Sequence, residues 1–200
     1  MFGRKRHFPT LAGVGRSDAG ALVVGLGNPG RRYSGTRHNA GYMAAEVLIR
    51  ESEVVAEGDW PQGLLAFTRR GPTEFLVLRP RTFMNNSGTA VAPVLKHYGL
   101  APSRLVVVHD DIDIPAGGVK VKKGGGTAGH RGLESLVQSL GSDGFYRVRI
   151  GIGRPPDGMD AADYVLGAFS PPEREEAKLS AATAADLALS LVREVEGEEG

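Results

Sequence analysis

The sequence predicts an α/β protein of one domain and three layers, in which a twisted, mixed β-sheet is flanked by helices. Short apolar segments alternate along the chain with segments whose apolar residues recur every three or four positions, as in a sheet covered by helices. Two apolar segments joined by the turn Gly71-Pro72 interrupt this alternation, and such a hairpin adds antiparallel strands to a parallel sheet. The chain of 200 residues is long enough for one core, and no repeat or long linker divides it.

The elements expected in order are a strand at 21–24, a helix at 40–51, hairpin strands at 63–69 and 74–78, a helix ending at Gly99, strands at 105–108 and 119–122, a helix from about 130 to 140, a strand at 145–150 and a helix from 171 to about 195. The last helix is predicted from its start. There, Ser170-Pro-Pro-Glu173 combines a serine cap, a proline in the first turn and a glutamate three residues after the cap.

The two ends of the chain are charged and poor in apolar residues. We expect residues 1–18 to be a disordered basic extension, residues 19–196 to form the domain, and residues 197–200 to be an acidic tail. No apolar run reaches the roughly 18 residues of a membrane span, and the basic N-terminus lacks the apolar core of a signal peptide. Because the chain also has no cysteine, disulfides and thiolate chemistry are excluded. We therefore expect a cytoplasmic protein without membrane contact.

Three polar loops leave the carboxyl ends of predicted strands, at residues 25–39, 79–88 and 109–117. Ligands of open α/β sheets favour the crevice outside these strand ends. The first loop contains Gly25-x-Gly27-x-x-Gly30, which matches a dinucleotide-binding pattern in its letters. That pattern requires a helix to begin at the glycines, whereas here the helical periodicity starts about ten residues later. We therefore expect a ligand site at these loops and regard a dinucleotide as the weaker interpretation.

His38 and Asp110 are the residues that suggest catalysis. His38 stands just before the first helix, and Asp110 ends a buried strand, where a carboxylate can hydrogen-bond to an imidazole. Such a partner fixes the histidine tautomer and stabilises its charged form, which makes the ring a better general base. A turn cluster or a metal loop around Asp110-Asp111-x-Asp113 is the alternative, although no spaced histidine or glutamate accompanies it.

The sequence favours water over a serine as the nucleophile. It contains no Gly-x-Ser-x-Gly elbow, and Ser87 stands before a helix, where serine ordinarily serves as a cap. Asn28, Asn85 and Asn86 can each donate and accept hydrogen bonds, which suits binding an amide or polarising a carbonyl group. The same asparagines are equally common as turn and cap residues.

Basic residues form local clusters, one of which holds three lysines within residues 118–123, although 24 Lys and Arg against 23 Asp and Glu give the chain little net charge. Lys120, Lys122 and Lys123 precede a glycine-rich turn and a helix start, a combination that suits a phosphate. Arg147 and Arg149 alternate along one strand and so share one face, which would suit a nucleic-acid backbone. Lysines that protect a solvated edge strand are the competing explanation.

Taken together, these stretches resemble the bacterial peptidyl-tRNA hydrolases. The matching motifs lie in order between about residues 21 and 190: Val24-Gly-Leu-Gly-Asn-Pro-Gly30, Thr36-Arg-His-Asn-Ala-Gly41, Thr82-Phe-Met-Asn85 with Ser87-Gly88, Val108-His-Asp110 with Asp113 and Pro115, Gly124-Gly-Gly126 with Gly129-His130, and Arg147-Val-Arg-Ile-Gly-Ile-Gly153.

The resemblance implies hydrolysis of the ester that joins a peptide to the terminal ribose of tRNA, without a metal or cofactor, by a monomer. It also implies a role for each matched residue: His38 as the base that activates water, Asp110 as the group that orients His38, Asn28 as the group that distinguishes a blocked from a free amino group, Tyr33, Phe83, Asn85 and His130 as contacts to the substrate end of tRNA, and Lys122 and Arg149 as phosphate contacts.

The sequence departs from the family pattern at two places. Arg131 follows His130 where an asparagine is usual, so that an RNA contact there would act through charge, since arginine cannot accept a hydrogen bond. The tail is acidic where members of the family often end in a basic helix, so the resemblance does not extend to a contribution of the tail to tRNA binding. A non-catalytic RNA-binding relative and a nucleotide-binding module remain the alternative functions at this stage.

Overall fold

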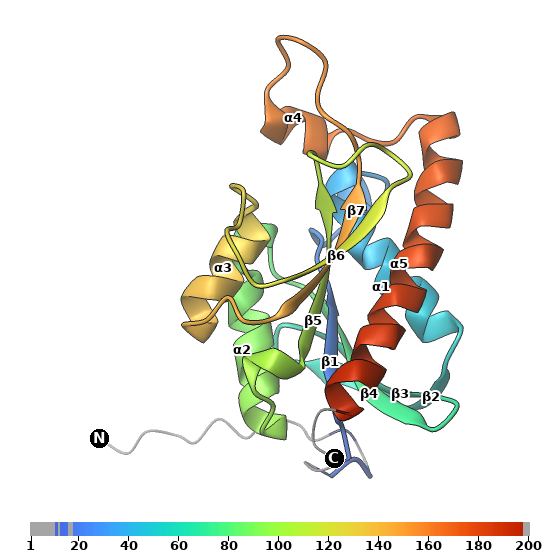
Figure 1. The fold of residues 1–200 in the computed structure, drawn as a ribbon, viewed down its shortest axis with the longest axis vertical. Coiled ribbons are helices and arrows are strands. Elements are labelled where there is room, and N and C mark those ends of the chain that lie inside the picture. The colour runs from blue at the N-terminus through green and yellow to red at the C-terminus, as the bar shows by residue number, and fades with distance from the viewer. Residues whose placement is uncertain (1–10, 12, 16–17, 198–200) are drawn as a thin grey trace.

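The computed structural model describes residues 11, 13–15 and 18–197. One seven-stranded sheet forms the centre of the molecule, in the order β2-β3-β4-β1-β5-β7-β6 (Figure 1). The strands are β1 (Leu22–Gly25), β2 (Glu53–Trp60), β3 (Gly63–Arg70), β4 (Thr73–Pro80), β5 (Leu105–Asp111), β6 (Val119–Lys123) and β7 (Tyr146–Gly151). The helices are α1 (Ala40–Arg50), α2 (Ser87–Tyr98), α3 (Arg131–Leu140), α4 (Ala161–Leu166) and α5 (Pro171–Gly197).

The sheet is mixed, as the sequence predicts. Its centre is parallel, because β1 pairs in parallel with both β4 and β5, and β5 pairs in parallel with β7. The hairpin β3-β4 is antiparallel, β2 continues it, and β6 lies antiparallel to β7 at the other edge. The carboxyl ends of β1 and β5 therefore lie side by side in the middle of the sheet, with Gly25 opposite Val108.

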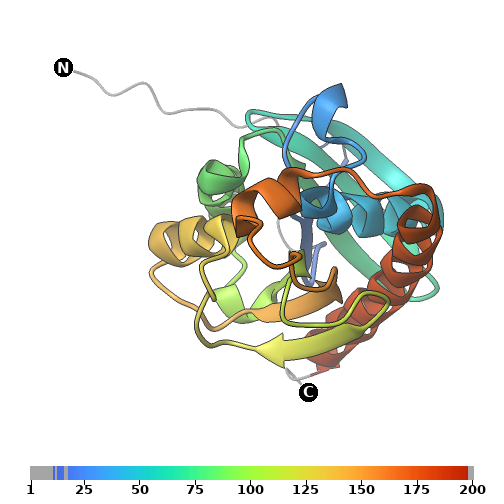
Figure 2. The ribbon, with the colours of Figure 1, turned by 90° about the horizontal axis from the view of Figure 1, so that it is seen from above.

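Helices cover both faces of the sheet, which confirms the predicted three layers (Figures 1 and 2). One core cluster joins α2 and α3 to residues such as Leu22 and Val24 of β1. The other joins α1 and α5 to Ala21 and Val23. Alternate residues of β1 thus enter different layers, which explains why this strand is apolar at every position.

Gly25 and Gly41 allow α1 to lie unusually close to the sheet. A β-carbon at Gly25 would stand 2.3 Å from the Gly41 carbonyl oxygen, and one at Gly41 would stand 2.3 Å from the Val108 carbonyl oxygen. The helix α1 begins at Ala40, ten residues after Gly30, and its Tyr42 amide donates to the Leu26 carbonyl oxygen at 3.1 Å, so the chain does not pass from the glycines directly into a helix that presents its first amides to a pyrophosphate. Gly25 serves helix packing, and the dinucleotide interpretation is wrong.

Two elements, β2 and α4, are absent from the prediction. Most of β2 is exposed and three of its eight residues are acidic, so its apolar face is limited to Ala56 and Trp60, which pack in the core, and main-chain pairing with β3 defines the rest. The helix α4 has six residues and begins at Asp160, whose carboxylate accepts a hydrogen bond from the Ala162 amide at 2.8 Å. It is too short to show a helical period.

The predicted extension at residues 1–18 lies largely outside the described residues. The described part includes Leu11 and Val14, which are buried in the cluster on the α2–α3 side, so the core draws on positions before residue 19. Of the predicted tail, residues 198–200 lie outside the described residues and Gly197 ends α5. None of the described helices is both long enough and apolar enough to cross a membrane.

Candidate active site

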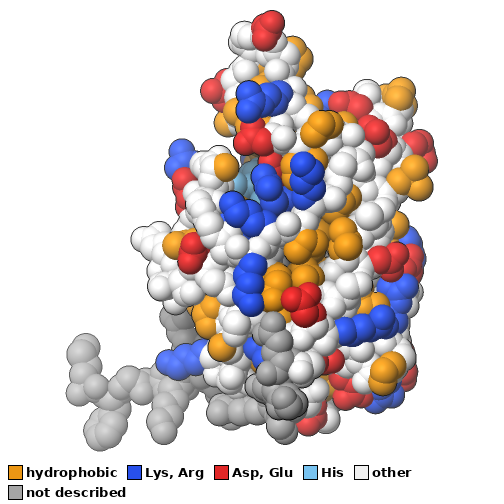
Figure 3. Space-filling view, viewed as in Figure 1, with side chains coloured by type: hydrophobic (Ala, Val, Ile, Leu, Met, Phe, Trp, Pro, Cys, Tyr) orange, Lys and Arg blue, Asp and Glu red, His pale blue; other side chains and the backbone are white. Residues whose placement is uncertain are grey.

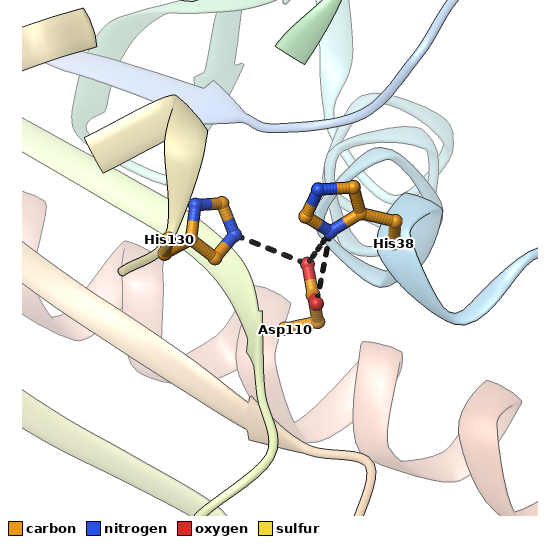
Figure 4. A group of neighbouring side chains, drawn as sticks. All are labelled: His38, Asp110 and His130. Carbon is orange, nitrogen blue, oxygen red and sulfur yellow. Dashed lines mark hydrogen bonds and ion pairs between the residues drawn. The ribbon is translucent and has the colours of Figure 1, made fainter. Parts of the chain in front are cut away.

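His38, Asp110 and His130 come from three elements and meet at the carboxyl ends of β1 and β5 (Figure 4). His38 belongs to a 3₁₀ turn, Arg37–Asn39, directly before α1. Asp110 lies near the end of β5, and His130 precedes the first residue of α3. We call these three side chains the catalytic cluster. His38 and Asp110 were expected to meet, whereas His130 was predicted only as a contact to tRNA.

The turn that carries His38 is fixed by its neighbour Arg37. The Arg37 guanidinium donates to both carboxylate oxygens of Glu173 at 2.8 and 3.0 Å, at the start of α5. The Arg37 amide donates to the carbonyl oxygen of Gly167 at 3.1 Å, just after α4. Hydrogen bonding to Arg37 and Ser170 lowers the pKa of Glu173 to about 2, so the pair stays charged at neutral pH. The turn that carries His38 is therefore attached both to the start of α5 and to the residue after α4.

Asp110 accepts hydrogen bonds from both histidines. His38 Nδ1 lies 2.9 and 3.0 Å from the two carboxylate oxygens of Asp110, and His130 Nε2 lies 3.2 Å from Oδ1. The carboxyl group is buried, which alone would raise its pKa, but the charges and hydrogen bonds of His130 and His38 outweigh burial and lower the pKa well below its usual range. Asp110 is thus a buried carboxylate anion.

The hydrogen bonds define where the ring protons are. His130 Nδ1 accepts from the amides of Gly132 and Leu133, at 3.1 and 3.4 Å, so the neutral ring carries its proton on Nε2 and donates it to Asp110. When His38 is neutral, donation from Nδ1 to the carboxylate places its single ring proton on Nδ1, so that Nε2 carries a lone pair. A neutral imidazole with a free Nε2 lone pair is a competent general base.

His109 lies behind the catalytic cluster and was not predicted as part of it. Its ring centroid is 4.8 Å from that of His130, and its Nδ1 donates to the Asp110 carbonyl oxygen at 2.7 Å. Burial, together with the charge of His130, lowers the pKa of His109 to about 3, so this ring is neutral at physiological pH. Alternation along β5 shows that His109 and Asp110 face opposite sides, but not that the ring packs against His130.

Asn28 is oriented by its surroundings. Its side-chain Oδ1 accepts from the Met84 amide at 2.8 Å, and the Asn39 side chain holds the Asn28 main chain through two hydrogen bonds of 2.8 and 3.0 Å. Because Oδ1 is occupied, Nδ2 is the polar side-chain atom of Asn28 that remains available to a ligand. Asn28 therefore acts toward a ligand as a hydrogen-bond donor, although the sequence alone left both donor and acceptor roles open.

A cavity of about 650 Å³ joins the catalytic cluster to the other predicted contact residues. All three polar loops reach it, as expected, and so do the turn before α3 and the helix α4, whose contribution was not predicted. At its wall Tyr33 and Phe83 make an edge-to-face contact with ring centroids 6.3 Å apart. The residues lining it are Asn28, Tyr33, His38, Phe83, Met84, Asn85, His109–Asp113, Thr127–Arg131, Asp160–Ala162, Val165 and Leu166.

The predicted phosphate contacts Lys122 and Arg149 do not line this cavity. In the register of β6 and β7, Lys120 stands opposite Arg149 and Lys122 stands opposite Arg147. The side chains of these four residues therefore share one face of the sheet. We call Lys120, Lys122 and Arg149 the basic strip. Lys and Arg side chains gather over this region of the surface (Figure 3). Arg149 also forms an ion pair with Asp111 at 2.8 Å, which ties the strip to the cavity wall.

Arg147 differs from the expectation that it faces an RNA backbone. It is 2% exposed, and its guanidinium donates to the carbonyl oxygens of Gly126 and Gly125, at 2.7 and 2.5 Å. These glycines cover the side chain, and alternation along the strand cannot reveal this. Similarly, the amides at the start of α3 are occupied by His130 and cannot serve a phosphate as the glycine-rich turn suggested. Arg131 is exposed at the cavity rim and pairs with Glu134 at 3.6 Å.

Among the described residues, the catalytic cluster is also the group whose donor atoms lie close enough to share a metal ion, all within 4.8 Å of one another. Hydrogen bonding accounts for this spacing, because Asp110 accepts from both rings. A metal would have to displace those protons. The arrangement is that of an imidazole base backed by a carboxylate, beside an amide donor and a cavity open to a ligand.

Comparisons with known proteins agree with this geometry. Residues 22–198 match the model of the peptidyl-tRNA hydrolase family. Peptidyl-tRNA hydrolases of Frankia alni and Moorella thermoacetica are 43% and 46% identical over 182 and 149 residues, which are 91% and 74% of this chain and 92% and 78% of theirs. The crystal structure of peptidyl-tRNA hydrolase from Acinetobacter baumannii superimposes with a TM-score of 0.81 and 34% identity, covering 93% of this chain and 94% of that one. The chain belongs to the peptidyl-tRNA hydrolase family, as its motifs predict.

Proposed function

We propose that this protein hydrolyses the ester between the peptide and tRNA in peptidyl-tRNA, with His38 as the general base. The observation that carries this proposal is the contact of His38 Nδ1 with the buried Asp110 carboxylate at 2.9 Å, which leaves Nε2 free to take a proton. Family membership supplies the substrate, and the cavity around His38 supplies the place for its ester group.

In this mechanism His38 Nε2 removes a proton from a water molecule as its oxygen attacks the ester carbonyl carbon. The tetrahedral intermediate then collapses, the bond to the ribose oxygen breaks, and the His38 imidazolium returns the proton to that oxygen. The products are a peptide with a free carboxylate and tRNA with a free terminal hydroxyl. Asp110 stabilises the imidazolium while it exists, and His130 holds Asp110 in place by its own hydrogen bond.

Asn28 supports discrimination between blocked and free amino groups. With Oδ1 held by Met84, its Nδ2 can donate to the carbonyl oxygen of the acyl group that blocks the amino terminus. A free aminoacyl ester has an ammonium group there, which offers only donors and a positive charge. The loss of a buried hydrogen-bond match can cost orders of magnitude in selectivity. Charged tRNAs used in translation would thus be spared.

The remaining predicted residues suit the tRNA part of the substrate. Tyr33, Phe83 and Asn85 line the cavity from the loops after β1 and β4, where the aromatic rings can contact a base. We assign phosphate contacts to Lys122 and Arg149 of the basic strip, because both are basic and share one face of the sheet. We further propose that the domain of residues 19–196 works in the cytoplasm as a monomer, which light scattering after size-exclusion chromatography would test.

The test is release of free tRNA from N-acetylaminoacyl-tRNA, with the unblocked aminoacyl-tRNA as the matched substrate. The wild type should cleave only the blocked substrate efficiently. Replacing His38 by alanine should lower the single-turnover rate about 10²–10⁴-fold, the usual contribution of general base catalysis, without lowering the melting temperature. Unchanged turnover in His38→Ala would overturn the assignment. Binding of tRNA without any cleavage by concentrated wild-type protein would instead favour a non-catalytic RNA-binding relative.

A further inference from the structure

A second cavity of about 500 Å³ lies on the other side of Asn28 from the catalytic cluster, and Asn28 lines both cavities. We call it the second pocket. It is formed by the loop after β1, the first turns of α1 and the adjacent ends of β3 and β4. The residues lining it are Asn28, Pro29, Gly30, Arg31, Ser34, Asn39, Tyr42, Met43, Glu46, Leu64, Arg79 and Arg81. Of the residues assigned above to catalysis or tRNA binding, the second pocket contains only Asn28.

The charges of the second pocket favour an anion. Three arginines line it against one glutamate. Arg79 pairs with that glutamate, Glu46, at 2.6 Å, and Arg81 pairs at 2.7 Å with Asp59, an exposed residue outside the lining. Arg31 is exposed, and its guanidinium makes no hydrogen bond or ion pair with any described residue. A full positive charge is therefore available at the mouth of the pocket.

Two buried polar atoms at the second pocket also have no hydrogen-bond partner among the described residues: the hydroxyl oxygen of Tyr42 and Nε of Arg79. Tyr42 shares the lining of the pocket with Arg79 and Arg81, and burial raises the pKa of its hydroxyl to about 12, so the hydroxyl keeps its proton at neutral pH. Unpartnered buried polar groups are rare in folded proteins, and a bound polar ligand is one common explanation.

The order of the strands indicates which part of the substrate reaches the second pocket. The catalytic cluster stands at the ends of β1 and β5. The basic strip lies to one side of it, on β6 and β7, whereas the second pocket lies to the other side, at the ends of β4 and β3. The ester joins the peptide to tRNA, and these two parts extend in different directions from the ester carbonyl carbon. If tRNA phosphates lie over the basic strip, the peptide leaves toward β4 and β3, past Asn28.

We propose that the second pocket is a subsite for the peptide part of the substrate and binds a carboxylate on the residues that precede the esterified one. Arg31 is the residue that meets this carboxylate, and Arg79 and Arg81 supply the surrounding positive potential. An arginine free of other partners can bind a carboxylate through two parallel hydrogen bonds. The subsite rests on the proposed function, and it adds a preference for acidic peptides.

The experiment compares three N-acetyldipeptidyl-tRNAs that differ only in the first residue of the dipeptide, which is glutamate, glutamine or lysine, with alanine esterified to the same tRNA. The wild type should show the highest kcat/KM for glutamate and the lowest for lysine, with about tenfold between them. In Arg31→Gln the ratio of glutamate to glutamine should fall to about one. Arg50→Gln, an exposed arginine at the far end of α1 and outside both cavities, should keep the wild-type ratio.

Equal kcat/KM for the three peptides in the wild type would overturn the subsite, and so would a preference for glutamate that persists in Arg31→Gln. If Arg31→Gln lowers kcat/KM equally for all three peptides and for N-acetylalanyl-tRNA, the pocket binds a tRNA phosphate and the peptide subsite is wrong. Failure of the proposed function gives a different result, because wild-type protein would then not cleave N-acetylalanyl-tRNA at all.

Discussion

The catalytic cluster is built around Asp110 at the end of β5, and the basic strip lies on the neighbouring strands β7 and β6, but their side chains have opposite surroundings. His38 and Asp110 are 8% and 3% exposed, and each is fixed by hydrogen bonds to the other. Lys120 and Lys122 are exposed on the edge strand β6 and have no ion pair with a described residue, while Arg149 is partly buried and paired with Asp111. The catalytic cluster is defined by the geometry of its hydrogen bonds, and the basic strip is defined by its positive charge.

The two regions should therefore respond differently to substitutions and to salt concentration. In the buried cluster, the hydrogen bonds fix the positions of the protons, and dissolved salt screens the charges only weakly. In the exposed strip, each charge is screened within about 8–10 Å at physiological ionic strength, so a single side chain contributes little and its contribution falls with salt. Substitutions in the cluster should alter the chemical step, and those in the strip should alter affinity.

The largest contrast is expected between Arg147 and Arg149, which lie two residues apart on β7. Replacing Arg147 by methionine leaves the carbonyl oxygens of Gly125 and Gly126 without their donors, which should cost about 1–3 kcal/mol in the free energy of unfolding. Arg149→Met removes one ion pair and leaves the Asp111 carboxylate its hydrogen bond from the Asp113 amide at 2.9 Å, so it should cost less than Arg147→Met and should weaken tRNA binding instead. Urea unfolding of both variants measures this difference, and equal losses would contradict the assigned burial of Arg147.

The next effect concerns the dependence of stability on pH. His109 is neutral when folded, with a pKa of about 3, whereas an unfolded histidine titrates near 6.5. As the pH falls from about 6.5 to about 3, the unfolded state takes up a proton that the folded state does not. Stability is therefore lost as the pH falls through this window, by about 2 kcal/mol at pH 5.

His109→Asn tests this dependence, since its amide can still donate to the Asp110 carbonyl oxygen but does not titrate. The loss of unfolding free energy between pH 7 and pH 5 should be smaller in the variant by about that amount. The same loss in variant and wild type would show that His109 is not the group responsible.

The smallest effect is expected for Lys122→Ala in the basic strip. The dissociation constant for tRNA should rise a few-fold. The slope of the logarithm of the association constant against the logarithm of salt concentration should decrease in magnitude by about one, which corresponds to one lost phosphate contact. The rate at saturating enzyme should not change. Lys96→Ala, an exposed lysine on α2, is the matched control. If both variants bind tRNA with the same loss, the strip has no special role.

Sequence patterns predict the parts of the site that depend on strand ends. His38 and Asp110 were placed together because two apolar strands, 21–24 and 105–108, each lead into a polar loop, and parallel strands end at the same edge of a sheet. The fold class, the hairpin and the long helix α5 follow from periodicity and turn residues in the same way. These features depend on neighbours in the sequence.

The features that were missed depend on contacts between distant residues. The bond of His130 to Asp110, the orientation of Asn28 by Met84 and the burial of Arg147 under Gly125 and Gly126 each require the folded chain. Arg147 and Arg149 have the same residue type and the same face, so no local pattern separates them. The strand β2 was missed because its apolar face is short: Trp60 is buried in the core and Ala56 packs against it, but acidic residues alternate with them and a register shift between Val54 and Ala56 interrupts the pattern.

In the proposed mechanism, Asp110 holds His38 in the tautomer that can act as a base. The most direct test is the single-turnover rate of Asp110→Asn on N-acetylaminoacyl-tRNA at saturating enzyme, with tRNA affinity measured on the same protein. An asparagine oxygen in the place of Oδ1 could accept from both rings, but it has no negative charge to stabilise an imidazolium, and its amide offers a donor where Oδ2 accepts from His38. The rate should fall about 10²–10⁴-fold while the affinity for tRNA stays near that of the wild type. A rate within about threefold of the wild type would contradict the claim.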